Sequence, residues 1–288
     1  MTAPRRPVLR WHGGKWVLAP WIISHFPEHR IYVEPFGGAA SVLLRKERCD
    51  AEVYNDLDGS VVDLFRVLQN TDQADRLMEL LRITPFARAE FTRAFEPTEC
   101  PVEQARRLII RSFMGFGSDG AHNQTTGFRA NSNRSGSTPA HDWANYPDAL
   151  DRVVKRMRGV IVESRPAAQV MTAHDGFDVL HYVDPPYVHE TRDVTTGSNR
   201  APRHQYAHEL TLEDHEALLL TLKGLDGMVV LSGYPHPLYD DLLPDWKRVE
   251  KEALADGARK RTEVLWINPA CADALEREVL PMFAGVTG

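Results

Sequence analysis

Short runs of β-branched and aromatic residues alternate along the chain with segments in which apolar residues follow helical spacing. The runs predict buried strands, and the helical spacing predicts amphipathic helices. The predicted strands are 31–34, 51–54, 160–163, 228–232 and 264–268. A further predicted strand contains residues 179–180 and ends near residue 183. The predicted helices are 41–48, 58–70, 147–158 and 211–222, with a further strand or short helix around 238–243 and 246–250. This alternation predicts an α/β fold with a Rossmann-like, mostly parallel sheet.

The middle of the chain has a different pattern. From residue 71 to about 110 it is helical, divided into short helices by Pro85, Pro97 and Pro101. Residues 112–147 are rich in Gly, Ser, Asn and Thr, and they exceed the ~12 to 15 residues of an ordinary loop. We therefore expect residues 71–159 to form a separate, mainly helical domain, inserted between 1–70 and 160–288, which together form the other domain.

Composition limits the class of protein. With 43% hydrophobic and 26% charged residues, the chain is typical of a globular protein rather than a fibrous or disordered one. Its 3 cysteines are widely spaced, which argues against a disulfide framework and a cysteine metal site, and indicates a reducing cytoplasm. No segment reaches the roughly 18 apolar residues of a membrane span, and no apolar signal-peptide region follows the basic N-terminus. We expect a cytoplasmic protein without membrane contact.

The charge distribution favours a polyanionic partner for the middle segment only. The net charge is -6, yet residues 86–159 contain 11 Lys and Arg against 8 Asp and Glu. This local charge of +3 leaves -9 for the rest of the chain. A basic segment in an acidic chain is consistent with nucleic-acid binding, although a solvated helical face also accounts for so small an excess.

A glycine-containing turn follows the first predicted strand. Glu34 ends that strand, and Pro35-Phe36-Gly37-Gly38-Ala39-Ala40 separates it from the next predicted helix. Strand, glycine turn and helix open a nucleotide-binding α/β unit, but the G-x-G-x-x-G pattern is missing, which disfavours NAD. The second strand ends in Asn55-Asp56, where such folds place a carboxylate on ribose hydroxyls. Asp58 is a better candidate for the N-cap of the helix that follows.

The sequence Asp184-Pro185-Pro186-Tyr187 follows the strand that ends near residue 183. Two consecutive prolines hold the backbone extended, between a carboxylate and an aromatic ring. The Asp184 carboxylate and the Pro185 carbonyl can accept hydrogen bonds from an amino group while the Tyr187 ring stacks on its heterocycle. This combination suits a nucleobase taken out of a helix. The alternative interpretation is a proline turn that ends a strand.

Near the N-terminus, Trp11-His12-Gly13-Gly14-Lys15 resembles a phosphate-binding loop only superficially. No strand precedes it, and Trp16 occupies the position at which Ser or Thr would bind magnesium. Glycines between an indole and an ammonium group instead suggest a segment that passes close to a ligand, with Trp11 to stack and Lys15 to meet a carboxylate. A flexible N-terminal arm is the alternative.

Aromatic, basic and amide residues are interleaved in the long polar segment. Arg and Asn can contact guanine and adenine edges, and aromatic rings can wedge between bases or stack on them. The candidate DNA-binding residues are Arg111, Phe128, Arg129, Asn131, Asn133 and Arg134. Lys155, Arg156 and Arg158 at the end of the next helix could contact phosphates, or could simply complement the helix dipole. Residues 188–208 could form a lid or a plain surface loop.

The motifs follow strands of one predicted sheet, so their side chains should meet in one crevice. Their order resembles that of the Dam-type, D12-class S-adenosylmethionine-dependent DNA adenine-N6 methyltransferases. In that family a K-W-x-G-G-K segment, an E-P-F-x-G-x-G turn and D-P-P-Y occur in this order, with the target-recognition region between the last two. The later stretches L-S-G-Y at 231–234 and W-I-N-P at 266–269 extend the resemblance over nearly the whole chain.

The resemblance implies a site-specific enzyme that methylates adenine N6 in double-stranded DNA, with base flipping and no metal. It implies S-adenosylmethionine binding by Trp11, Lys15, Glu34, Phe36, Gly37, Asp56 and Asp184, and catalysis by Asp184, Pro185, Pro186 and Tyr187. We expect a monomer; the motifs specify neither the DNA site nor a restriction endonuclease partner. An RNA base methyltransferase and a non-catalytic DNA-binding module are the alternatives. The ~90-residue insertion argues against the first, and retention of Asp184 and Tyr187 against the second.

Overall fold

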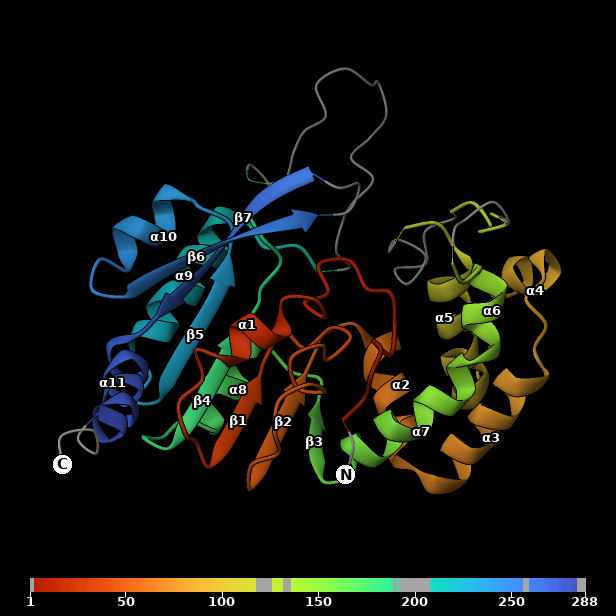
Figure 1. Ribbon diagram of the computed structural model, residues 1–288, viewed down its shortest axis with the longest axis horizontal. Helices are drawn as coiled ribbons and strands as arrows, with labels where there is room; N and C mark the ends of the chain where they lie inside the picture. Colours follow the sequence, from red (N-terminus) through yellow and green to blue (C-terminus); the bar gives the residue numbers. More distant parts are fainter. Residues whose placement is uncertain are drawn as a thin grey trace, which may run out of the picture.

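The computed structural model describes residues 3–117, 126–131, 136–188, 191, 208–255 and 259–283. This part of the chain contains a seven-stranded sheet with the order β3-β2-β1-β4-β5-β7-β6 (Figure 1). The strands are β1 (Ile31–Glu34), β2 (Ala51–Asn55), β3 (Val160–Glu163), β4 (Val179–Val183), β5 (Met228–Gly233), β6 (Lys247–Ala255) and β7 (Arg259–Ile267). The six strands expected from the sequence are therefore confirmed, and β6 and β7 extend further than expected.

The strand pairing places a binding crevice beside β1. This strand pairs in parallel with both β2 and β4, while β3 and β5 continue the parallel sheet outward. Among the strands of the described residues, only β7 runs antiparallel, between β5 and β6. The strand order reverses between β1 and β4, and at such a point ligands bind outside the carboxyl ends of the strands. The prediction of a Rossmann-like α/β sheet is confirmed.

Helices cover both faces of the sheet. They are α1 (Ala19–Ile23), α2 (Gly59–Gln69), α3 (Thr71–Ile83), α4 (Arg88–Arg93), α5 (Pro101–Met114), α6 (Pro139–Ala144), α7 (Tyr146–Met157), α8 (Ala167–Ala173), α9 (Leu212–Lys223), α10 (Pro237–Leu242) and α11 (Pro269–Phe283). In β5, Met228 and Val230 join one hydrophobic cluster, while Val229 and Leu231 join another that includes residues of α8 and α9. This alternation is expected for a strand that is buried on both faces.

Helices α3 to α7 gather beyond the β3 edge of the sheet, with α2 between them and the strands (Figure 1). The prolines act as expected: Pro85 and Pro97 lie between helices, and Pro101 begins α5. Buried residues of these helices, such as Leu77 and Ile109, belong to the same hydrophobic cluster as Tyr32 and Leu180 of the sheet. The boundaries of a separate inserted domain therefore stay a prediction.

The segment after the glycine turn differs from the expected helix. Residues 41–45 form consecutive turns instead, followed by a bend at residue 46, and the preceding Ala40 has a positive φ of 53°. The cause lies in the hydrogen bonding of Leu43. Its amide donates to the Glu34 carboxylate at 2.9 Å rather than to a carbonyl of its own segment. A buried side chain thus replaces the helical ladder at this point.

The long polar segment is shorter than expected. Helix α5 continues to Met114, and α6 and α7 occupy much of 139–157. Between them, Phe116 donates its amide to the Gly127 carbonyl, and Arg129 donates its amide to the Met114 carbonyl. The region 238–250 contains both of the elements considered for it, a short helix and a strand. The lid or surface loop considered for 188–208 falls mostly outside the described residues.

Candidate active site

The carboxyl ends of β1, β2 and β4 open into a cleft. The N-terminal residues 11–15 form part of its wall, so segments far apart in the sequence meet here. All residues expected to bind the cofactor line this cleft: Trp11, Lys15, Glu34, Phe36, Gly37, Asp56 and Asp184. Pro186 of the proposed catalytic sequence lines it as well. The structure therefore brings the separate motifs together in one place.

The glycine turn leaves no room for larger residues. A Cβ at Gly37 would lie 2.2 Å from the Tyr54 ring, and one at Gly38 would lie 2.6 Å from Trp11 Nε1. Gly38 also has a positive φ of 46°, which favours glycine. Its amide donates to Asp56 Oδ2 at 2.7 Å, and its carbonyl accepts from the Tyr54 hydroxyl at 2.7 Å. The turn is thereby fixed beneath the Trp11 indole.

Two carboxyl groups in the cleft wall are held by the chain itself. Glu34 Oε2 accepts hydrogen bonds from the Tyr32 hydroxyl and the Leu43 amide, and burial raises the pKa of Glu34 to about 8. Asp56 accepts from the amides of Gly38 and Asp58, and burial raises its pKa also. Both groups shape the cleft. Asp58 caps α2, with its side chain 2.9 Å from the Ser60 amide, as expected.

Asp184 lies where β4 ends, and both of its intramolecular partners contact the same oxygen. Lys15 Nζ is 2.9 Å from Asp184 Oδ1, and Ser232 Oγ donates to Oδ1 at 2.9 Å. Within the described residues, Oδ2 makes no hydrogen bond. The side chain is 16% exposed, so it retains access to the cleft. Asp184 is thus held in place with one acceptor oxygen still available for another donor.

Tyr187 is buried beside this carboxylate. Lys15 Nζ lies 4.6 Å from the centre of the Tyr187 ring, and Tyr234 packs edge-on against it. The Tyr187 hydroxyl is 2.9 Å from Ser232 Oγ and 2.9 Å from Glu263 Oε2. Sequence reasoning missed Ser232 and Glu263. The L-S-G-Y stretch contains the first, and a lone acidic residue in the apolar run of β7 was the available signal for the second.

The candidate DNA-binding residues follow a different pattern. Arg111 is partly buried on α5 and donates to the Ala94 carbonyl at 2.6 Å. Phe128 packs against Phe86 and Phe91. Arg129 donates to the Phe113 carbonyl, and Asn131 is exposed; Asn133 and Arg134 lie outside the described residues. These intramolecular contacts of Arg111 and Phe128 stabilise the helices and the loop, and contact of the whole set with DNA stays a prediction.

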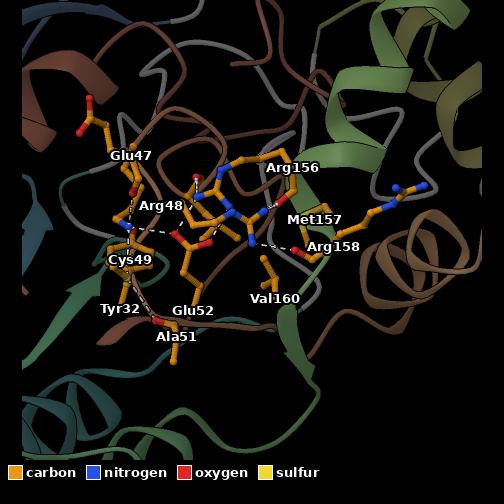
Figure 2. Close-up of polar contacts among 12 residues, drawn as sticks. Tyr32, Glu47, Arg48, Cys49, Ala51, Glu52, Arg156, Met157, Arg158 and Val160 are labelled. Carbon is orange, nitrogen blue, oxygen red and sulfur yellow. Dashed lines mark hydrogen bonds and ion pairs between the residues drawn. The ribbon is translucent and has the colours of Figure 1, made fainter. Parts of the chain in front are cut away.

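The basic end of α7 has an intramolecular partner on the sheet. Figure 2 shows the Glu52 carboxylate facing the Arg156 guanidinium, whose Nη1 and Nη2 atoms each donate to a different Glu52 oxygen. Lys46 Nζ donates to the same carboxylate at 2.9 Å, and Arg156 also donates to the Leu43 carbonyl. We call Glu52, Lys46 and Arg156 the Glu52 cluster. Since Arg156 is engaged there, its contacts do not support the phosphate-binding role considered for it.

Some alternatives can be addressed within the described residues. No group of three or more His, Cys, Asp or Glu side chains among them could hold a metal ion. All three cysteines are free thiols. In the described part of the chain, every helix is too short or too polar to cross a membrane.

The sheet order and the cleft define a Rossmann-like methyltransferase fold. The family described as D12 class N6 adenine-specific DNA methyltransferase matches residues 11–223. The chain belongs to this family, which confirms the resemblance and the enzyme class expected from the motifs.

Relatives agree with this assignment. The DNA adenine methylase of Escherichia coli K12 is 24% identical over 226 residues, which cover 76% of each chain. That of Salmonella typhi is 23% identical over 218 residues, or 74% of each chain. A methylase of the same name from Vibrio cholerae is 36% identical over 70 residues, and this match spans only about a quarter of either chain (24% and 25%).

Proposed function

We propose that this protein transfers the methyl group of S-adenosylmethionine to the N6 amino group of adenine at a specific site in double-stranded DNA. The target base would be taken out of the helix, and the reaction would take place in the cytoplasm. One observation carries the proposal. Asp184-Pro185-Pro186-Tyr187 ends β4 in the same cleft as the glycine turn, with one Asp184 oxygen available.

The lining of the cleft suits the chemistry of S-adenosylmethionine. Trp11, Phe36 and Leu57 supply apolar and aromatic surface for the adenine ring, and Asp56 and Glu34 supply polar groups for hydroxyls. When bound, this cofactor would supply an electrophilic methyl group on a sulfonium. The chain's own residues would hold the cofactor and orient the methyl acceptor.

The chemistry explains the role of Asp184. The lone pair of the adenine amino group is delocalised into the ring, so the group is a weak nucleophile. Asp184 Oδ2 and the Pro185 carbonyl would accept its two hydrogens, which localises the lone pair and directs it toward the methyl carbon. Such electrostatic and orientational help is typically worth ~3 kcal/mol or more.

Tyr187 would stack on the flipped adenine. In this structure the ring is 6% exposed and carries Lys15 over one face. A base can therefore stack on it only after a neighbouring side chain moves aside. Lys15 is the side chain best placed to do so, since the cleft already accommodates part of it.

The test is methyl incorporation from tritium-labelled cofactor into duplex DNA. We expect Asp184→Ala to slow transfer by at least about 100-fold, since the acceptor of the amino hydrogen is lost, while DNA binding is unchanged. Asp241→Ala removes an exposed carboxylate from α10 and serves as the matched control. Near-normal turnover of Asp184→Ala would contradict the proposed mechanism, and incorporation into RNA instead of DNA would contradict the substrate.

The target-recognition role of residues 71–159 has its own test. We propose that the loop between α5 and α6 contacts base edges, with Arg129 and Arg134 as specificity residues. Their replacement by Ala should weaken or relax site preference by about 1 to 3 kcal/mol per lost base contact, with cofactor affinity unchanged. Sequencing of methylated DNA measures the preference, and Arg76→Ala on the exposed face of α3 is the control. Unchanged preference in both loop variants would exclude the loop as the specificity element.

A further inference from the structure

Glu263, Tyr187, Ser232 and Asp184 form a linear series of polar contacts that ends at the cleft. Glu263 Oε2 is 2.9 Å from the Tyr187 hydroxyl, which is 2.9 Å from Ser232 Oγ. Ser232 Oγ is in turn 2.9 Å from Asp184 Oδ1. Glu263, Tyr187 and Ser232 are buried, with exposed fractions of 8%, 6% and 1%. Each pair of oxygens in contact therefore needs a hydrogen between them, because burial keeps out water that could otherwise donate one.

Counting hydrogens shows which groups must be protonated. The three contacts require three hydrogens, and the hydroxyls of Tyr187 and Ser232 provide only two. If both end groups were carboxylates, one pair of oxygens would face each other at 2.9 Å without a hydrogen between them. The third hydrogen must therefore lie on Glu263 or on Asp184.

The surroundings place that hydrogen on Glu263. The Lys15 ammonium is 2.9 Å from the Asp184 oxygen at the end of the series, so this oxygen already accepts from Lys15 as well as from Ser232. Glu263 is more deeply buried than Asp184. Burial is the largest influence and raises the pKa of Glu263, and the negative charge of Asp184 adds to this, whereas Lys15, the hydrogen bond with Tyr187 and Arg261 act in the opposite direction. Lys251 is the residue of β6 opposite Glu263.

We propose that Glu263 is a positioning residue that acts as a neutral carboxylic acid at the head of this series. Glu263 donates to Tyr187, Tyr187 to Ser232, and Ser232 to Asp184 Oδ1. Every donor then points toward the cleft, and Asp184 is fixed with Oδ2 directed to the methyl acceptor. This inference rests on the proposed methyl transfer for its kinetic consequence. Glu263 itself touches neither substrate nor cofactor.

A pair of substitutions separates positioning from mere packing. Glu263→Gln keeps a donor of similar shape, so single-turnover methyl transfer should stay close to wild type. Glu263→Leu removes the donor and should slow transfer by about tenfold, the equivalent of one hydrogen bond. Affinities for cofactor and duplex DNA should be unchanged in both variants. A Gln variant as slow as the Leu variant would overturn the neutral-acid role, and a Leu variant as fast as wild type would overturn positioning.

Further variants test the direction and continuity of the series. Tyr187→Phe interrupts it at the second member, so adding Glu263→Leu to Tyr187→Phe should cause no further loss of rate. An additive loss would show that the two residues act separately. Glu250→Gln alters an exposed carboxyl of β6, opposite Val264, and is the matched control for the effect of removing a charge.

Infrared spectroscopy tests the protonation state without any turnover. The carbonyl stretch of protonated carboxyl groups should be present in the wild-type protein at neutral pH, and the part of it that comes from Glu263 should be missing from Glu263→Gln. Glu34→Gln identifies the separate contribution of the buried Glu34 carboxyl. If no methyl transfer to DNA is found, the proposed function fails, but the band still decides whether Glu263 is neutral. If the band does not change in Glu263→Gln, the inference fails even with an active enzyme.

Discussion

Two carboxylates of this protein, one buried and one at the cleft, have opposite surroundings. Glu52 lies between Lys46 and Arg156, and its two oxygens accept from both cations. Although burial raises the pKa of Glu52, the hydrogen bonds and charges of Arg156 and Lys46 outweigh burial and lower it. Asp184 also has a cation, Lys15, but both of its partners contact one oxygen. Both oxygens of Glu52 are thus occupied, whereas one oxygen of Asp184 is available.

The difference separates a role in stability from a role in chemistry. Glu52 is buried, is absent from the lining of the cleft and has both oxygens engaged by cations, so we expect the Glu52 cluster to fix the sheet against α7 and the turns after Gly38. Asp184 is held as firmly at Oδ1 by Lys15 and Ser232 yet keeps Oδ2. Substitutions in the two places should consequently affect different measurements.

The largest expected effect is on folding stability. Arg156→Ala leaves Glu52 buried with Lys46 as its remaining cation, which should lower the free energy of unfolding by about 3 to 5 kcal/mol. Urea denaturation measures it. Arg48→Ala is the control, because exposed Arg48 donates to the carbonyls of Arg156 and Arg158 at the end of α7 and should cost only about 1 kcal/mol.

The comparison would fail if the two variants were equally stable, since burial would then not distinguish Arg156 from Arg48. It would also fail if Asp184→Ala destabilised the protein as much as Arg156→Ala. We expect Asp184→Ala to destabilise the protein less than Arg156→Ala, because the Asp184 side chain is 16% exposed at the cleft, while methyl transfer is lost.

Many of the residues that line the cleft could be predicted from local sequence patterns. Glu34, Asp56 and Asp184 each follow a short apolar run, and parallel strands place such residues at one edge of a sheet. Asp58 was identified as a cap because short acidic side chains accept hydrogen bonds from the first amides of a helix. These predictions depend only on strand periodicity and on residues within a few positions of each other.

The errors and omissions all involve partners distant in the sequence. The turns at 41–45 depend on a bond from Leu43 to Glu34. Arg156 was considered for phosphate contact because nothing in its helix indicates Glu52, which lies 104 residues away. Ser232 and Glu263 are 45 and 76 residues from Tyr187. Only the order β4-β5-β7 brings these last residues together, and strand order is not evident in local patterns.

The most gradual expected effect is a pH dependence that contrasts Glu34 with Glu52. Burial raises the pKa of Glu34 from 4.5 to about 8, so the folded protein keeps a proton there that the unfolded chain loses above pH 4.5. Since the folded state binds more protons, stability should fall as the pH rises from about 4.5 to 8, by about 1 kcal/mol per pH unit. Glu52 has a lowered pKa, so its contribution to folding stability is present above pH 4.5 and is lost as the pH falls below that value.

Glu34→Gln keeps an oxygen to accept from Leu43 and should remove the decline in stability between pH 6 and 8, as measured by urea denaturation. An equal decline in wild type and Glu34→Gln would show that Glu34 is already ionised in the folded protein, and the contrast between the two carboxyls would be lost.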